Sequence, residues 1–350
     1  MADVELSAMT SGAAGGGAGG GEGEAEVASA VDVASLVAGG MGETVRVPVR
    51  RGDGGNCACV TVSGDASLPY SLVTYADVCT GHEECFGSLT LCVGKGSLLR
   101  KHARVYHIDP PGHGADAGAD IDGSASYSLE DLAGDVADVV DHFGIKSNVL
   151  LLGAGAGAHV LAVWATHTRT PRNLVLGGLF LSPAAKKCSW SEWAWATAAV
   201  STLRSMLPGV GGWQPWLVDS VLKRWFSARA RGIVSRTDLA RGAAQRMTAL
   251  RPAAAAAYIS ALARREDITA RLKNFRGRAV VVAGSGCYDG GQTEALDFRA
   301  ACAPQRSVWI EVEGSGALVS EERPDALLRP LHLFSQAVGV IDPGVPMPAC

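Results

Sequence analysis

A run of small residues from Gly153 to Gly157, with the sequence GAGAG, joins an apolar strand-like stretch to a helix-like one. Small residues at this spacing permit a sharp strand-to-helix turn, and in the pattern G-x-S-x-G the serine at its centre is a nucleophile. The central residue here is Gly155, which has no side chain that could attack a carbonyl. The sequence therefore predicts a turn suited to nucleophilic catalysis that lacks its nucleophile.

Two later positions would complete such a site, an acid after one strand and a histidine after the last strand. The usual spacing places the acid at Cys287, and Asp289 could replace it only in a loop two residues longer. The histidine position falls on Ala317. A serine nucleophile must pass its proton to an oriented imidazole, so the loss of all three members leaves no conventional hydrolase mechanism. We therefore predict that the chain is not an enzyme.

An unrelated constellation could still supply a hydrolase with a non-standard nucleophile. The candidates are His82, His113, His159 and Ser285. We expect His159, one helical turn past Gly155, to pack or to face solvent. Ser285, like Ser315, sits between glycines, which is more typical of a turn than of catalysis.

The elements that would position these residues alternate along the chain. Short β-rich runs are followed by helical patterns, and this order is typical of a parallel sheet with covering helices. The helix at 128–143 has an apolar stripe and Ser128 as a plausible N-cap. Further helices are expected at 156–168 and 323–338. We predict an α/β-hydrolase-like fold with a mostly parallel eight-stranded sheet, helices on both faces and an opening antiparallel hairpin, its strands lying near 45–49, 59–62, 71–75, 104–108, 148–152, 174–181, 279–283 and 308–312.

The composition divides the chain into four parts. Residues 1–44 are rich in glycine and alanine, which bury little side chain on ordering, and predict a disordered tail. Residues 45–185 and 273–341 form the predicted core. Residues 186–272 contain six of the eight tryptophans and predict a helical cap inserted into the core, and 342–350 predict a flexible C-terminal tail.

The second half of the cap is basic. Residues 222–278 hold 14 lysines and arginines against three acidic residues. Arginines at a five-residue spacing advance by about 140° per step on an α-helix and so scatter around it. A solvated helix is one interpretation, and a partner-binding surface is the other, formed by Arg236, Arg241, Arg246 and Arg251.

Bulk properties exclude several classes of protein. The net charge of -4 gives no overall attraction to nucleic acid. The nine cysteines lack CxxC pairs, so we expect reduced thiols, no metal site and no cofactor. No apolar run approaches the roughly 20 residues of a membrane-spanning helix, and the acidic N-terminus is unlike a signal or transit peptide. A cytoplasmic location is expected.

Several dispersed motifs resemble those of the N-myc downstream-regulated protein family. They are VTYAD at 73–77, GH at 81–82, CF at 85–86, VYHID at 105–109, HFGIKS at 142–147 and the GAGAGA run at 153–158. The resemblance implies a hydrolase-like fold without a triad and a cytoplasmic adaptor role in signalling, stress response, growth or differentiation. It also implies protein partners, with heterotrimeric G-protein βγ as the candidate suggested by plant-type members.

Charged residues follow the strand ends, where α/β proteins bind ligands. Asp77 would place negative charge near a developing oxyanion and so oppose hydrolysis. A vestigial pocket would be lined by Asp77, His82, Asp109, His113, Ala154 and Ala156. It would suit a small-molecule or lipid receptor. The alternative is that Asp109 caps the following Pro-Pro-Gly turn and that His82 packs beneath the next helix.

Overall fold

A computed structural model describes seven stretches of the chain, namely residues 42–51, 56–93, 101–114, 126–206, 213–232, 237–288 and 290–345. The predicted N-terminal tail up to residue 41 and the last five residues lie outside them.

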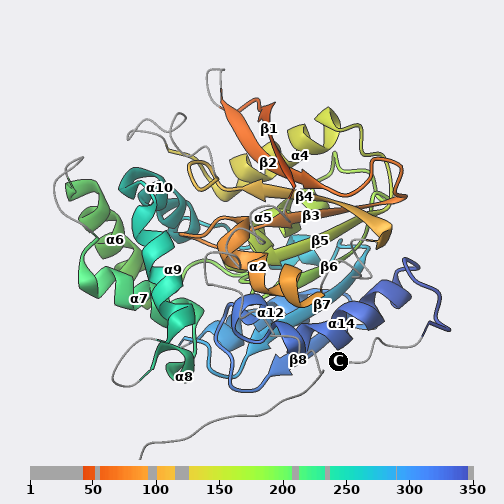
Figure 1. The fold of residues 1–350 in the computed structure, drawn as a ribbon. Helices are drawn as coiled ribbons and strands as arrows, with labels where there is room; N and C mark the ends of the chain where they lie inside the picture. Colours follow the sequence, from red (N-terminus) through yellow and green to blue (C-terminus); the bar gives the residue numbers. More distant parts are fainter. Residues whose placement is uncertain are drawn as a thin grey trace, which may run out of the picture.

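The core of the molecule is one eight-stranded sheet, drawn across the centre of Figure 1. The strand order is β1-β2-β4-β3-β5-β6-β7-β8. β1 and β2 form the expected antiparallel hairpin, β2 pairs antiparallel with β4, and all other pairs are parallel. The strands are β1 (Glu43–Pro48), β2 (Cys57–Ser63), β3 (Tyr70–Tyr75), β4 (Ala103–Asp109), β5 (Val149–Ala154), β6 (Val175–Leu181), β7 (Arg278–Gly284) and β8 (Ser307–Val312). The predicted mostly parallel sheet is confirmed.

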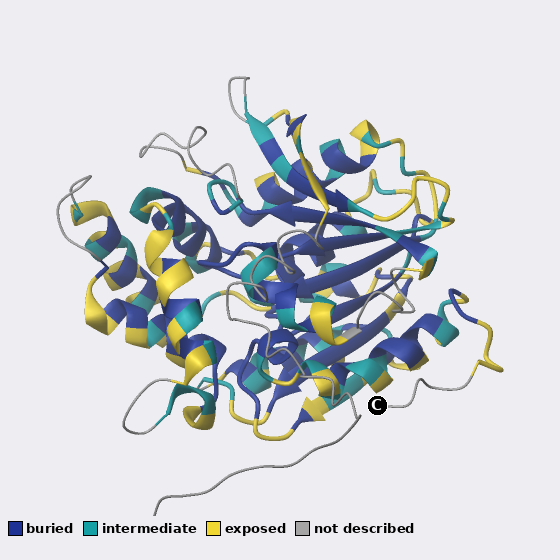
Figure 2. Cartoon of the chain, viewed as in Figure 1, coloured by how far each residue is buried: buried dark blue, intermediate teal, exposed yellow. Residues whose placement is uncertain are grey.

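The central strands are buried on both faces, as Figure 2 shows. Every residue of β5, with the sequence VLLLGA, is buried. A parallel strand covered on both faces needs a continuous apolar run rather than alternation, and this run places the small-residue turn at the carboxyl end of the sheet.

Helices cover both faces of the sheet (Figure 1). On one face α4 (Leu129–His142) packs on α5 (Gly155–Thr166), and α12 (Gly291–Ala301) continues this layer. On the other face α2 (His82–Val93) packs on α13 (Val319–Glu322) and α14 (Pro324–Ala337). The helix expected at 323–338 is α14. The short helix α13 precedes it and is separate, because Pro324 has no N–H to continue α13 and begins α14 instead.

The predicted cap lies between β6 and β7 in the chain and forms the separate layer at the left of Figure 1. Its helices are α6 (Trp190–Ser205), α7 (Pro215–Trp225), α8 (Ala228–Arg231), α9 (Asp238–Ala249) and α10 (Pro252–Ala263). The short helix α11 (Thr269–Leu272), also within the predicted cap, packs on α5 and α12 of the core. The interpretation of the basic run as one helix was wrong. Gly232, at a φ of 76°, follows α8, and Pro252 begins α10, so Arg231 lies in α8, Arg241 and Arg246 lie in α9, and Arg251 is the N-cap residue of α10.

No helix in the described stretches is long and apolar enough to span a bilayer.

Candidate functional site

The small-residue turn leads directly from β5 into α5, of which Gly155 is the first residue. Gly155 has a φ of +51°, a left-handed conformation that side-chain-bearing residues rarely adopt. A Cβ atom placed there would lie 2.1 Å from Oδ1 of Asp77. The carboxylate of Asp77 therefore occupies the space into which a nucleophilic side chain would project.

Asp77 follows β3 and is almost fully buried. Its Oδ1 accepts a hydrogen bond of 2.8 Å from the backbone N–H of Ala156. In a hydrolase this amide, one residue after the nucleophile, stabilises the oxyanion. Burial raises the pKa of Asp77, and this is opposed by Arg224, whose Nε lies 3.8 Å from Oδ2, and by the amides of Ala156 and Val78. The carboxylate of Asp77 is therefore hydrogen-bonded to the amide that would bind the oxyanion in a hydrolase.

The other two predicted triad positions, Cys287 and Ala317, lie near one another. Sγ of Cys287 is 3.7 Å from Oγ of Ser182, which donates a 3.0 Å hydrogen bond to the carbonyl of Ala317. Burial raises the pKa of the Cys287 thiol, which keeps it neutral and weakly nucleophilic. The next residue, Leu318, donates its N–H to the carbonyl of Trp225, so the end of α7 covers this loop. Asp289 lies outside the described residues.

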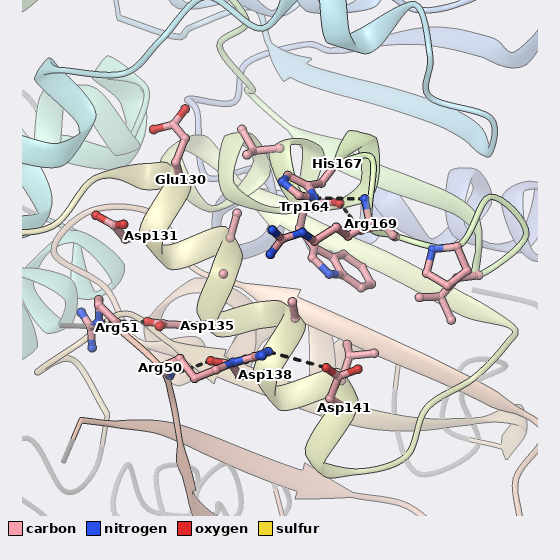
Figure 3. Close-up of a pocket in the computed structure, with 18 of the residues that line it drawn as sticks. Arg50, Arg51, Glu130, Asp131, Asp135, Asp138, Asp141, Trp164, His167 and Arg169 are labelled. Atoms are coloured by element: carbon pink, nitrogen blue, oxygen red, sulfur yellow. Dashed lines mark hydrogen bonds and ion pairs between the residues drawn. The ribbon is translucent and has the colours of Figure 1, made fainter. Parts of the chain in front are cut away.

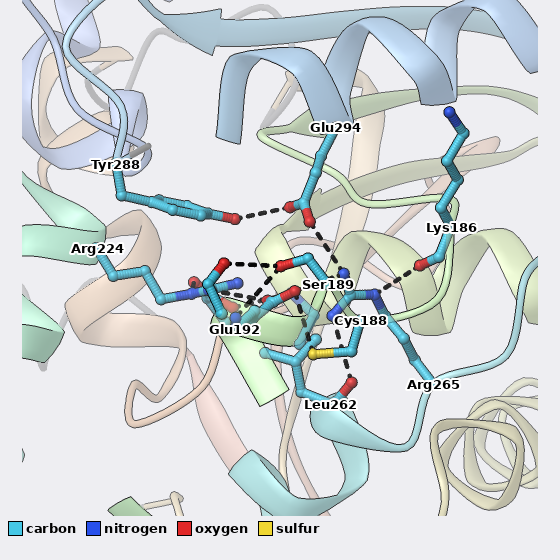
Figure 4. A network of polar contacts seen from close by, with 12 residues as sticks. Lys186, Cys188, Ser189, Glu192, Arg224, Leu262, Arg265, Tyr288 and Glu294 are labelled. Atoms are coloured by element: carbon cyan, nitrogen blue, oxygen red, sulfur yellow. Dashed lines mark hydrogen bonds and ion pairs between the residues drawn. The ribbon is translucent and has the colours of Figure 1, made fainter. Parts of the chain in front are cut away.

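A network of buried charges joins the cap to the core beside Asp77 (Figure 4). Glu192 of α6 lies between two arginines, with Arg224 of α7 at 3.2 Å and Arg265 after α10 at 2.7 Å. Arg265 also contacts Glu294 of α12 at 3.0 Å, and the hydroxyl of Tyr288 donates to Glu294 at 2.9 Å.

The electrostatics of this network favour an ionised Glu192. Burial raises the pKa of its carboxyl, but Arg224 and Arg265 outweigh burial and lower it to about 2. The guanidinium of Arg224 also stacks over the ring of Tyr288, 4.6 Å from its centroid. This network was not predicted, although Glu192 is the only acidic residue between 186 and 205. An isolated acid in an apolar helix was the available signal, because a buried carboxylate requires a cationic partner.

The residues of the predicted vestigial pocket divide into two groups. His82, Asp109 and His113 line one cavity of about 410 Å³, whereas Asp77, Ala154 and Ala156 do not belong to its lining. The two oxygens of Asp109 accept hydrogen bonds from the backbone N–H of His82 at 2.7 Å and from its Nδ1 at 2.8 Å. Asp109 therefore anchors the start of α2 rather than the Pro-Pro-Gly turn. Burial lowers the pKa of His82, but Asp109 outweighs it and the net shift is upward.

The proposed replacement nucleophiles have local structural contacts. Ser285 is exposed and accepts from the N–H of Gly314 at 2.9 Å, whereas Ser315 is buried and donates to the next carbonyl. Neither serine bonds to a histidine in the described stretches. His159 is fully buried beside the carbonyl of Ala184, and burial lowers its pKa to about 4.

A larger cavity, of about 660 Å³, is lined by residues of α4, the end of α5, the segment after β1 and the loop before β6 (Figure 3). Arg50 donates to Asp138 from both its backbone N–H and its side chain, at 2.7 and 2.6 Å. Arg51 lies 3.3 Å from Asp135. These ion pairs attach the segment after β1 to α4, which is a structural role.

The described residues of the predicted arginine surface have different surroundings. Arg246 and Arg251 line the 410 Å³ cavity, and Nε of Arg246 lies 3.6 Å from Glu84 of the core. Arg241 is not part of that lining; its side chain is 60% exposed and pairs with Asp238. Arg236 lies outside the described residues. In the same stretches, no three His, Cys, Asp or Glu side chains are grouped so as to hold a metal ion.

Comparisons with known proteins agree on family and fold. A model of the Ndr family matches residues 55–342. Protein NDL3 of Arabidopsis thaliana is 32% identical over 81% of this chain and 79% of its own length, and an NDRG-like protein of Dictyostelium discoideum is 25% identical over 82% and 84%. A thermophilic esterase from Thermogutta terrifontis, solved with malate bound, superposes with a TM-score of 0.68 at 16% identity, covering 85% of this chain and 99% of the esterase. The structural likeness shows the α/β-hydrolase fold alone.

Proposed function

The chain belongs to the Ndr family, and on that premise we propose that it is a non-enzymatic, cytoplasmic adaptor protein built on the frame of an α/β-hydrolase. The observation that carries the proposal is the position of Asp77. Its carboxylate fills the space above Gly155 and accepts the N–H of Ala156. A substrate carbonyl would meet neither a nucleophile nor a free oxyanion-binding amide at this turn, and a buried acid would oppose the developing charge.

The network beside Asp77 fits a structural use of the former catalytic centre. Charged groups from α6, α7 and α12 meet where the cap covers the strand ends. We infer that the centre now fixes the cap to the core and so presents a rigid cap surface to a protein partner. Roles in signalling, stress response, growth or differentiation, and G-protein βγ as a partner, belong to this proposal through family membership.

One experiment with two readouts tests the adaptor function. The purified chain should release no p-nitrophenol from p-nitrophenyl acetate above the buffer rate, and it should bind purified G-protein βγ. Arg241→Glu should weaken that binding by roughly three- to tenfold, mainly through a slower association rate, because a charge at the rim of an interface steers encounter. Arg246 is unsuitable for this test because it also contacts Glu84 of the core.

Arg329→Glu is the matched control, since it makes the same charge change at an exposed position of α14 in the core. If the Arg241 and Arg329 variants bound G-protein βγ equally well, Arg241 would not belong to the partner-binding surface. If the wild-type chain hydrolysed the ester and Ser285→Ala or His82→Ala abolished this activity, the chain would instead be a hydrolase with a non-standard nucleophile.

A second candidate function is the binding of a small molecule or lipid in the cavity beside His82. The supporting observation is that buried His82, Asp109 and His113 meet the cap residues Arg246 and Arg251 around a space of about 410 Å³. A ligand that raises the Tm of the wild-type chain but not that of His82→Ala would support it. Equal stabilisation of both proteins would place the ligand elsewhere.

A further inference from the structure

We propose that the outward side of α6 docks onto the surface of an anionic lipid bilayer. This surface is separate from the adaptor function proposed above. Its six residues recur at three- and four-residue intervals, so they share one side of the helix, and all are exposed. We call it the tryptophan face, and it consists of Trp190, Trp193, Ala194, Thr197, Ala198 and Ser201.

Two stacked indoles dominate the tryptophan face. Trp190 is 78% exposed and Trp193 is 43% exposed. Their ring centroids lie 5.1 Å apart with an interplanar angle of 22°. Large apolar side chains in water are unfavourable, and a neighbouring exposed pair is typical of a binding surface. The indole ring is apolar with one polar N–H, which suits the headgroup level of a membrane.

The charges around the tryptophan face favour an anionic surface. Glu192, the only acid of α6, is directed to the other side of the helix, where Arg224 and Arg265 hold it. Exposed Lys187 precedes α6, and exposed Arg204 lies near its end. Arg204 comes about four helical turns after Trp190, so both lie on the same side of the helix. The charges that this segment presents outward are therefore positive, as binding to anionic lipid requires.

The outer position of α6 favours a bilayer over a peptide. α6 is the outermost helix of the cap in Figure 1. The linings of the two cavities described above include no residue of α6. Exposed indoles flanked by cations on an outer helix can enter a planar lipid interface without any change in the fold.

Vesicle flotation tests the proposal. The full chain should float with vesicles of phosphatidylcholine plus phosphatidylserine and much less with phosphatidylcholine alone. Trp190→Ala with Trp193→Ala should weaken binding by about tenfold or more, because two large apolar contacts are lost. Lys187→Glu with Arg204→Glu should weaken it by at least about tenfold and remove its dependence on phosphatidylserine and salt.

Leu296→Ala with Leu333→Ala is the matched control, because these leucines are 42% and 50% exposed on α12 and α14. Binding and Tm should both be unchanged. The proposal is wrong if the wild-type chain fails to float or if the double tryptophan variant floats equally well. It is also wrong if sedimentation shows a wild-type dimer that the tryptophan variant loses, since the face would then join two copies. G-protein βγ binding that depends on Arg241 is unaffected by any of these outcomes.

Discussion

Gly155→Ser should destabilise the protein instead of creating an esterase. The backbone at Gly155 has a φ of +51°, and any Cβ there would lie within 2.5 Å of three atoms of the Asp77 carboxyl group. A left-handed conformation costs about 1–2 kcal/mol for a residue with a side chain, and overpacking of a buried site adds about 1–3 kcal/mol. We therefore expect urea unfolding to show a loss of about 2–5 kcal/mol in the free energy of unfolding.

Gly134→Ser is the control for that measurement. Gly134 lies in α4, and a Cβ there would meet no atom within 4 Å. Serine has the better helix propensity, so the stability should change by about 0.5 kcal/mol or less. Adding Asp77→Gly to Gly155→Ser removes the clashing carboxylate and should restore part of the loss. If the Gly155→Ser protein were as stable as wild type, the carboxylate of Asp77 would not fill the space beside residue 155.

Arg265→Met should lower the free energy of unfolding by a similar amount, because it removes the partner of buried carboxylates. The side chain of Arg265 is fully buried and contacts both Glu192 and Glu294. Its removal leaves carboxylates in the interior with only Arg224 nearby. Breaking a buried ion pair from one side costs about 3–5 kcal/mol, because a charge stays buried without compensation. Urea unfolding should show this loss, and limited proteolysis should cut the cap faster because the network attaches it to the core.

Arg271→Met provides the comparison at an exposed ion pair. Arg271 lies 3.4 Å from Glu266, and their side chains are 40% and 61% exposed. Solvent screens such pairs, so we expect a change of about 0.5 kcal/mol or less. If the two arginine variants lost stability equally, the buried network would not stabilise the fold more than an exposed ion pair does. Adding Glu294→Gln to Arg265→Met should recover part of the stability, since one uncompensated charge is removed.

Local patterns were sufficient for much of the architecture and for the family. Short β-rich runs predicted all eight strands. The signal is strongest for a central strand such as β5, because a strand covered on both faces needs continuous apolar residues. Ser128 accepts from the N–H of Asp131, as the predicted N-cap of α4 should. The resemblance to the N-myc downstream-regulated family is confirmed. The arginine spacing was misleading, because Gly232 and Pro252 separate α8, α9 and α10.

The interior of the site depended on contacts between distant parts of the chain. Asp77 meets Ala156, 79 residues later, because β3 and β5 are neighbours in the sheet. Glu192 meets Arg265 across 73 residues through the packing of the cap. A sequence pattern can reveal a missing nucleophile at Gly155, but which side chain fills the space depends on strand order and helix packing.

The placement of Asp77 above Gly155 also bears on how this fold can change over evolutionary time. A single codon change that returned serine to position 155 would collide with the carboxylate, and a change at Asp77 alone would leave Arg224 without one of its two carboxylates. Each of these single substitutions would therefore pass through a less stable protein before a serine nucleophile and an open turn could be present together.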